Sequence, residues 1–312
     1  MSEILSLEVP ATATTHGDGL AKSLLTPSST AEILVEALPY IQQFAGKSVV
    51  VKLGGAAIDP ESDRALAQDV LLLRSVGVRC VLVHGGGPQV DAMLRRVGKQ
   101  PEFRDGLRVT DAETLEIVRM VLVGKINRDL VATINREALD EPVAVGVSGE
   151  DAGLLTVTPR EPSLGFVGDV SLVRASVLHR LLDEGLAPVV STIGADESGH
   201  PYNINADEAA RAIAVAMNAE KIVYLTAAPG LLEDVADERS LVPRLTSAEL
   251  RERISHASVS AGMIPKLRAC ADAVDGGVGE AHIIDGRVPH ALLIELLTDE
   301  GIGTMVKREK SW

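Results

Sequence analysis

Aromatic residues are scarce: only 2% of the 312 residues are Phe, Trp or Tyr. With 46% hydrophobic residues the chain can still bury a large core, which must be aliphatic, and its length allows one large α/β domain or two lobes. No apolar run approaches the roughly 18 residues of a membrane-spanning helix. The first 28 residues contain no apolar stretch typical of a secretory signal. We therefore expect a cytoplasmic protein without a membrane span.

Cysteine and positive charge are also in short supply. The two cysteines, Cys80 and Cys270, lie in apolar surroundings, which favours buried free thiols over a disulfide or a metal site. Lys and Arg number 30 against 44 Asp and Glu, for a net charge of −14. This balance excludes the broad basic face that nucleic acid requires. Small anionic ligands remain possible, because they need only a local cluster of cations and backbone N–H groups.

The stretch Val49-Val50-Val51-Lys52-Leu53-Gly54-Gly55 predicts a buried strand that ends in a lysine and two glycines. Glycines at such a turn let backbone N–H groups approach a phosphate, and Lys52 would add a mobile positive charge. The order differs from the Walker pattern, in which the lysine follows the glycines. A plain tight turn with a solvated lysine is the alternative interpretation.

A second strand, residues 80–84, runs into Gly85-Gly86-Gly87-Pro88 and a helix start. Two successive units of strand, glycine turn and helix predict a parallel sheet with both turns at the same edge, where helix N-termini meet ligands. His84 could contact a ligand, although a local hydrogen bond that positions the loop is the favoured interpretation.

The N-terminal region divides in two. Residues 1–28, rich in small and polar residues, predict a flexible tail, and residues 29–46 predict an amphipathic helix. From its spacing alone, packing on its own domain is favoured over exchange with another subunit.

Several polar residues further along have both a structural and a functional interpretation. Arg108 follows a predicted hairpin with Asp105-Gly106 at its turn. It is either an exposed surface arginine or a residue whose guanidinium binds a carboxylate through two hydrogen bonds. Thr110 to Glu113 resembles a capping box before a helix that reaches about residue 139, and residues 165–170 resemble another hairpin. Asn203 and Asn205 precede Asp207, for which helix capping is the simpler role. Lys266, at a helix start, would be explained by a nearby anion.

Together these stretches resemble the amino-acid kinase family. Five motifs occur in the family's order within residues 30–306. They are Val51 to Gly55, Val83 to Pro88, Gly106 to Thr110, Asn203 to Asp207 and Gly262 to Lys266. The resemblance implies a three-layer αβα sandwich with a mainly parallel sheet at residues 47–312. Its N-lobe, about residues 47–200, would bind acetylglutamate, and its C-lobe, about 201–312, would bind ATP.

The resemblance implies transfer of the ATP γ-phosphoryl group to the γ-carboxylate of N-acetyl-L-glutamate, with Mg²⁺ bound to ATP and no metal held by the protein. Lys52 and Lys266 would stabilise the transferred phosphoryl group, and Asp207 would hold both lysines. The other implied contacts fall into two groups. N-acetylglutamate would be bound by Gly86, Gly87, Arg108 and Asn203, and phosphate or nucleotide by Gly54, Gly55, Gly230 and Leu231.

One segment departs from the family pattern. The family usually has an aspartate after the threonine of its nucleotide-side strand, whereas this chain has Thr226-Ala227-Ala228. This departure motivates an alternative, a catalytically weak arginine or amino-acid sensor of the same fold. A kinase for a related acyl substrate, such as an aminoadipate derivative, is a further alternative.

The resemblance also extends to arginine-inhibited members of the family, which have the N-terminal helix and a similar C-terminal segment. It therefore favours the interpretation of the helix at 29–46 as an arm that links subunits. It also implies a homo-hexamer, a trimer of dimers, that is inhibited by L-arginine. Five residues are candidate arginine contacts: Tyr40, Lys221, His290, Glu295 and Gly303.

Overall fold

The computed structural model describes residues 26–54, 60–139, 141–255 and 263–308. Its contacts divide the chain into two units, Met1–Leu38 and Pro39–Trp312, which we describe separately. Helix α1 (Pro27–Phe44) confirms the predicted N-terminal helix and crosses the boundary between them. Its C-terminal residue, Phe44, is 2% exposed in the core of the second unit.

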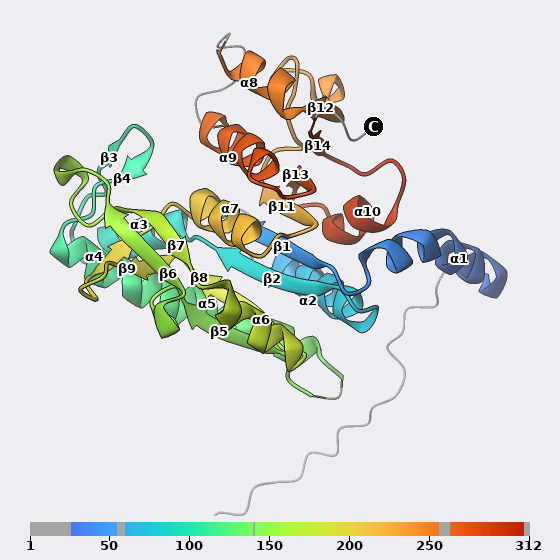
Figure 1. Ribbon diagram of the computed structural model, residues 1–312, viewed down its shortest axis with the longest axis horizontal. Coiled ribbons are helices and arrows are strands. Elements are labelled where there is room, and N and C mark those ends of the chain that lie inside the picture. The colour runs from blue at the N-terminus through green and yellow to red at the C-terminus, as the bar shows by residue number, and fades with distance from the viewer. Residues whose placement is uncertain (1–25, 55–59, 140, 256–262, 309–312) are drawn as a thin grey trace, which may run out of the picture. The chain divides into compact units, whose positions relative to one another are not determined.

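An eight-stranded sheet forms the centre of the second unit (Figure 1). All neighbouring strands are parallel except β13 and β14, so the predicted mainly parallel sheet is confirmed. In spatial order the strands are β12 (Arg244–Thr246), β14 (Thr304–Lys307), β13 (Glu280–Asp285), β11 (Lys221–Thr226), β1 (Ser48–Leu53), β2 (Arg79–His84), β8 (Ala187–Ser191) and β5 (Ala144–Ser148). The short strands β12 and β14 are absent from the sequence-based prediction.

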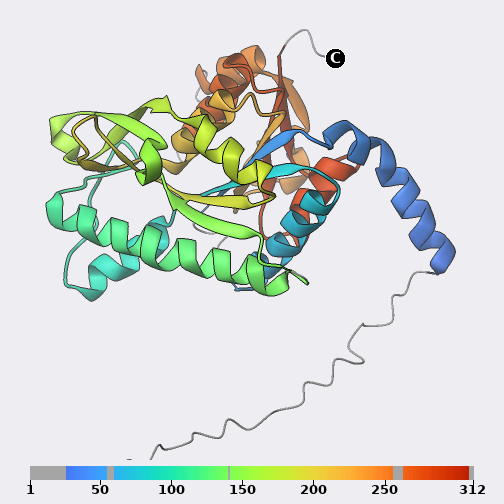
Figure 2. The ribbon, with the colours of Figure 1, turned by 60° about the horizontal axis from the view of Figure 1, so that its bottom comes forward.

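Helices cover both faces of this sheet and complete the predicted three layers (Figure 2). Successive residues of β1 enter different cores: Val50 belongs to one, and Val49 and Val51 to the other. A strand buried on both faces is apolar throughout, which explains its continuous run. One face carries α6 (Ala175–Asp183), α7 (Ala206–Ala216), α8 (Ser247–Ser255) and α9 (Ile264–Asp275); the other carries α2 (Pro60–Ser75), α5 (Asn127–Glu137) and α10 (Ala291–Leu297).

The second unit also contains a separate four-stranded sheet and a two-stranded hairpin. The strands of the small sheet are β10 (Pro201–Asn203), β9 (Ile193–Ala195), β6 (Leu155–Pro159) and β7 (Gly168–Val173). The prediction of a hairpin within residues 165–170 is wrong, because these residues lead into β7, which pairs antiparallel with β6. The hairpin of β3 (Phe103–Arg104) and β4 (Leu107–Arg108) confirms the predicted turn, with Asp105 at φ 48° and Gly106 at 79°.

The predicted long helix after Thr110 is α4 (Ala112–Arg119), a π-helical segment Met120–Ile126, and α5. Its N-cap is Asp111, whose side chain accepts the Thr114 N–H at 2.8 Å, and not Thr110. π-Helical turns recur at functional sites because they redirect side chains. Here the segment brings Leu122 and Ile126 against Gly86, just before α3 (Gly87–Arg96).

Both cysteines are buried and free, which confirms the prediction, and burial raises the pKa of Cys80 to about 12. Within the described residues, no helix combines the length and the apolar character that crossing a membrane requires.

Candidate active site

Three charged residues from distant parts of the chain meet beyond the carboxyl end of β1. The Asp207 carboxylate lies between two lysines, with Oδ1 2.7 Å from Lys52 Nζ and Oδ2 2.9 Å from Lys266 Nζ. Lys52 is the penultimate residue of β1, Asp207 lies in the first turn of α7, and Lys266 lies in the first turn of α9. The anion predicted near Lys266 is therefore Asp207.

Burial and mutual charge set the protonation of this cluster. Burial alone would raise the pKa of Asp207, but the positive charges of Lys52 and Lys266 outweigh it and hold that pKa below its usual value. Burial lowers the pKa of Lys52, an effect that Asp207 opposes and Lys266 reinforces. The carboxylate is thus ionised at neutral pH and holds the two lysines close together despite their like charge.

The expected capping role of Asp207 belongs to its neighbour Asn205. Asn205 is the N-cap of α7, and its Oδ1 accepts the backbone N–H of Asp207 at 2.9 Å and of Glu208 at 3.2 Å. Because Asn205 caps the helix, the Asp207 carboxylate is available for the lysines.

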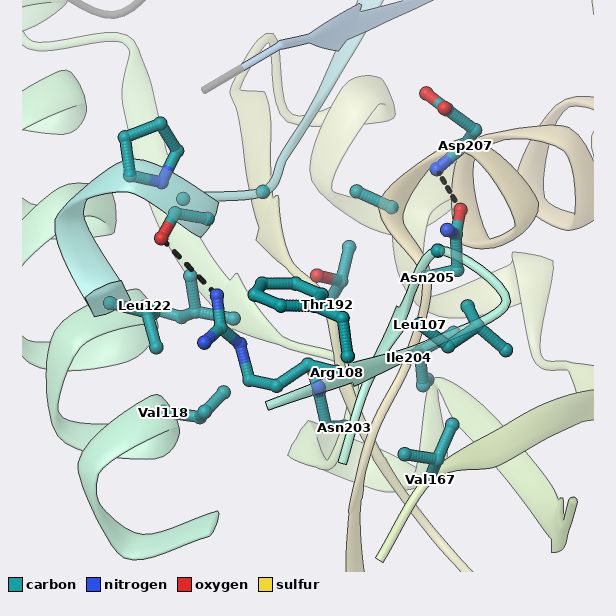
Figure 3. Close-up of a pocket in the computed structure, with 18 of the residues that line it drawn as sticks. Leu107, Arg108, Val118, Leu122, Val167, Thr192, Asn203, Ile204, Asn205 and Asp207 are labelled. Atoms are coloured by element: carbon teal, nitrogen blue, oxygen red, sulfur yellow. Dashed lines mark hydrogen bonds between the residues drawn. The ribbon is translucent and has the colours of Figure 1, made fainter. Parts of the chain in front are cut away.

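A cavity of about 290 Å³ opens beside this cluster (Figure 3). Lys52 and Asp207 line it together with all four predicted substrate-binding residues, Gly86, Gly87, Arg108 and Asn203. Its walls also include apolar side chains, Val90, Phe103, Leu107, Val118, Leu122, Val167 and Ile204. The cavity thus combines an apolar wall with charged groups contributed by β1, β4 and α7.

The glycine turn after β2 is closely packed at one residue and open at the next. A Cβ atom on Gly86 would lie 2.1 Å from Ile126 Cδ1 and 2.8 Å from Leu122 Cδ2, so a larger residue there would force both side chains to move. A Cβ atom on Gly87 would meet nothing within 4 Å. The turn therefore packs tightly against the π-helical segment while Gly87 faces open space, where a ligand can approach α3.

Arg108 is buried at the cavity wall, 9% exposed, rather than a surface residue. Its side chain extends toward the first turn of α3, and Nη2 donates to the Gly87 carbonyl oxygen at 3.3 Å (Figure 3). Its Nη1 lies 2.6 Å from Asp91 Oδ1, and its guanidinium lies 4.8 Å from the centre of the Phe103 ring. Asn203 Nδ2 donates to Thr110 Oγ1 at 3.3 Å. Both predicted side chains are thus fixed by local contacts.

His84 has the local role that the sequence favoured. Its Nδ1 donates to the Gly85 carbonyl oxygen at 3.0 Å, and its Nε2 accepts from Asn127 Nδ2 at 3.1 Å. Burial lowers the pKa of His84 to about 4, so the ring is neutral at physiological pH. The imidazole connects the glycine turn to α5 and does not line the cavity.

Three of the predicted nucleotide contacts, Gly54, Gly230 and Leu231, lie outside this cavity. The Gly54 N–H donates to the Leu225 carbonyl oxygen at 3.0 Å, and Gly55 lies outside the described residues. Gly230 has φ 152°, and a Cβ atom there would lie 2.6 Å from Thr304 Oγ1, which explains the glycine. The Leu231 N–H donates to the same hydroxyl at 2.8 Å. Thr304 of β14 thus fixes the segment that follows β11.

A second cavity, of about 210 Å³, lies near the start of β11 and β13. It is lined by four of the five predicted arginine contacts, Tyr40, Lys221, Glu295 and Gly303. Tyr40 Oη donates to Asp299 Oδ1, and the Lys221 ammonium lies 4.8 Å from the centre of the Phe44 ring. His290 does not line this cavity; its Nδ1 lies 2.6 Å from Oδ1 of the buried Asp69 on α2.

Contacts among His282, Glu280 and Glu295 connect β13 to α10 in the lining of this cavity. His282 Nδ1 lies 2.6 Å from Glu295 Oε1, and Nε2 lies 3.1 Å from Glu280 Oε2. Glu280 also pairs with Lys221 and Lys307, each at 2.7 Å. Burial would raise the pKa of Glu295, but His282 and the backbone N–H groups of residues 302 and 303 lower it below its usual value.

Sequence-based reasoning missed Asp91, Glu280 and His282. Asp91 lies four residues after Gly87, one turn into the helix that follows the glycines. Its position in the sequence could therefore have suggested that its side chain lies near the ligand site at the same edge of the sheet. Glu280 and His282 alternate on β13, and two polar side chains at i and i+2 on a buried strand indicate one shared environment.

Comparison with known proteins agrees with this architecture. Residues 47–285 match the amino acid kinase family. The chain is 51% identical to an acetylglutamate kinase of Synechococcus sp. over 276 residues, 88% of this chain and 91% of that one. It is also 51% identical to the acetylglutamate kinase of Corynebacterium urealyticum over 300 residues, 94% of this chain and 97% of the relative.

Solved structures of the N-acetylglutamate synthase from Neisseria gonorrhoeae are similar at 27% identity. Its complex with coenzyme A and N-acetyl-glutamate has a TM-score of 0.81, covering 91% of this chain and 64% of the synthase. Its complex with coenzyme A and L-arginine has a TM-score of 0.78, covering 90% of this chain and 66% of the synthase. The family match spans the whole central sheet except β14, and therefore the chain belongs to the amino acid kinase family.

Proposed function

We propose that the protein transfers the γ-phosphoryl group of ATP to the γ-carboxylate of N-acetyl-L-glutamate. The product is N-acetyl-L-glutamyl 5-phosphate, and the reaction is the second step of arginine biosynthesis. The observation that carries this proposal is the Lys52–Asp207–Lys266 cluster beside a cavity that also contains Arg108 and Asn203. Relatives at 51% identity are acetylglutamate kinases, which supports the same substrate here.

The residues of the cavity suit the chemistry of phosphoryl transfer. The reaction needs positioning and positive charge around the transferred group and little covalent participation by the protein. Lys52 and Lys266 supply that charge, and Asp207 holds them in place. The acceptor carboxylate is ionised at neutral pH, so the reaction requires no general base.

Arg108 is the candidate partner of the α-carboxylate, with Asn203 and the N–H groups of Gly86 and Gly87 as further contacts. Guanidinium and carboxylate form strong charge-assisted hydrogen bonds, and the buried position of Arg108 strengthens them. The apolar wall that includes Val118 and Leu122 can accommodate the methylene groups of the ligand.

We assign the ATP phosphates to the turn at Gly54 and Gly55 and the nucleotide to Gly230 and Leu231 in the C-lobe, about residues 201–312. The N-lobe, about residues 47–200, contributes the acceptor site. Both oxygens of Asp207 face lysines, so this carboxylate is a poor ligand for Mg²⁺. No group of three or more His, Cys, Asp or Glu suited to a metal ion occurs within the described residues. Mg²⁺ would bridge the phosphate oxygens of ATP.

The direct test is ADP release by the purified chain with MgATP and N-acetyl-L-glutamate. We expect ADP formation to depend on both substrates and to yield an acyl phosphate that hydroxylamine traps as a hydroxamate. N-acetyl-L-aminoadipate in parallel reactions tests the alternative acyl substrate. Absence of ADP release with either acceptor, while arginine still binds, would favour an amino-acid sensor and direct attention to Ala227.

We propose L-arginine as an inhibitor that binds the second cavity. The cavity is lined by four carboxylates, Glu280, Glu295, Asp299 and Glu300, by three Lys or Arg side chains, Lys221, Arg244 and Lys307, and by His282; the Asp and Glu outnumber the Lys and Arg by one. This excess of one negative charge suits an amino acid with one net positive charge. The similar synthase structure that contains L-arginine supports the same ligand class for this fold.

Glu295→Gln is expected to raise the arginine concentration for half-maximal inhibition by about 10-fold or more, because a charge-assisted bond to guanidinium is lost. Dose–response curves of ADP release at fixed substrate concentrations measure this change. His290→Ala is the matched comparison, because His290 lies outside the cavity and its loss should change the inhibition little. Equal loss in both variants would place the arginine site elsewhere.

We also propose a homo-hexamer, a trimer of dimers, in which the helix at 29–46 links subunits. Four apolar side chains of α1 are exposed in the single chain: Ile33, Leu34, Val35 and Leu38. Measurement of the mass in solution, with and without residues 1–46, tests this assembly.

A further inference from the structure

The Arg108 guanidinium, assigned above to the substrate, already has a carboxylate partner within the protein. Asp91, on the first turns of α3, places Oδ1 2.6 Å from Arg108 Nη1. The side chain of Arg108 is 8% exposed and that of Asp91 is 21% exposed. Water therefore reaches Asp91 more readily than Arg108, and the pair lies at the boundary between the cavity wall and solvent.

The contact between these two side chains is close but poorly directed. Within the part of the chain that the structure describes, neither Arg108 Nη1 nor Asp91 Oδ1 makes a hydrogen bond of acceptable geometry. Arginine binds carboxylates best when two N–H groups point along the fork at two oxygens. Asp91 is fixed to α3 and does not reach that arrangement, whereas the carboxylate of a free ligand can rotate into it.

Asp91 also changes the charge of the site. Lys52, Lys266 and Arg108 contribute three positive charges, and Asp207 and Asp91 contribute two negative ones, which leaves a net charge of +1. Without the carboxylate of Asp91 the net charge would be +2. N-acetyl-L-glutamate carries two carboxylates, so its affinity should depend on this difference.

We propose that Asp91 is an internal competitor for Arg108 that lowers the affinity of the site for the α-carboxylate of the acceptor substrate. The proposal rests on the function proposed above. Before the substrate binds, Asp91 neutralises a buried cation, which stabilises the fold. When the substrate binds, its α-carboxylate takes over the guanidinium and Asp91 turns toward solvent, so part of the binding free energy is spent on separating the pair.

The test is Asp91→Asn, which keeps the shape of the side chain and removes its charge. Calorimetric titration without ATP is expected to give a dissociation constant for N-acetyl-L-glutamate about 3- to 10-fold lower than in the wild type. The expected change is of this modest size because solvent partly screens the charge of Asp91. N-acetyl-L-isoglutamine, whose α-carboxylate is replaced by an amide, should show no such gain. We expect kcat to change less than the dissociation constant.

Glu113→Gln is the control, because Glu113 pairs with Lys99 at the surface and is not part of the cavity lining. A thermal melt adds a second readout: the Asp91→Asn variant should be less stable without ligand and gain more from N-acetyl-L-glutamate than the wild type. A dissociation constant that is unchanged or raised would overturn the proposal and make Asp91 a support for Arg108.

Turnover by the wild type separates this inference from the proposed function. An active wild type without tighter binding in Asp91→Asn refutes only the role of Asp91. An inactive wild type whose Asp91→Asn variant binds N-acetyl-L-glutamate more tightly refutes the kinase reaction and supports the competition. No binding in either protein refutes both.

Discussion

Lys52→Ala is expected to lower kcat by about 10³-fold or more while changing KM for both substrates by only a few fold. The ammonium group lines the cavity, and in the proposed reaction it would contact the phosphoryl oxygens most strongly as charge develops in the transition state. The loss should therefore appear in turnover. Steady-state kinetics of ADP release, with each substrate varied in turn, measures the two parameters separately.

Two further variants make this prediction specific. Lys266→Ala should show the same pattern, because its ammonium binds the other oxygen of Asp207. Lys47→Ala removes a lysine from the residue before β1, where it pairs with Glu220 and is largely exposed, and should leave kcat unchanged. A large rise in KM with unchanged kcat in Lys52→Ala would contradict the assigned role.

Asp207→Ala is expected to affect both turnover and stability. The change leaves two lysines, one of them 6% exposed, close together without a counter-ion. Removal of one partner of a buried ion pair costs about 3–5 kcal/mol in the free energy of unfolding. We expect kcat to fall by about 10²-fold or more as well, because the lysines move apart without their anchor.

Chemical denaturation and ADP release measure the two effects of Asp207→Ala. Glu208→Ala is the matched control: the next residue on α7, it pairs with Arg211 at the surface, and its loss should cost less than about 1 kcal/mol. A stable Asp207→Ala variant with normal kcat would show that Asp207 does not organise the lysines.

Local sequence patterns predicted most of the fold. The short apolar runs at β1, β2 and β11, each followed by a turn that contains glycine, are typical of buried parallel strands. Strands β12 and β14 were not predicted, because three or four residues carry too short a pattern. The region at 165–170 was misassigned because its partner, β6, is fixed by tertiary pairing.

The residues of the candidate site also divide into those that local sequence patterns predicted and those that tertiary contacts brought together. Lys52 and the two glycine turns were recognisable because each lies at the end of a predicted strand. Local patterns could not show the partners of Asp207, which only the family resemblance implied, because 155 positions separate it from Lys52 and 59 separate it from Lys266 along the chain. The Asp91–Arg108 pair was missed for the same reason: the two residues are close only because the β3–β4 hairpin folds over the first turns of α3.

The sequence by itself determined the central strands β1, β2 and β11, the glycine turn after β2 and the placement of Lys52 at the carboxyl edge of a parallel sheet, since these depend on spacing within each element. Only the tertiary structure decided that Asn205, and not Asp207, caps α7, that Asp91 neutralises Arg108, and that His290 lies apart from the second cavity. Those choices depend on charges brought together from distant segments, and the energy of such contacts is set by burial and distance in space.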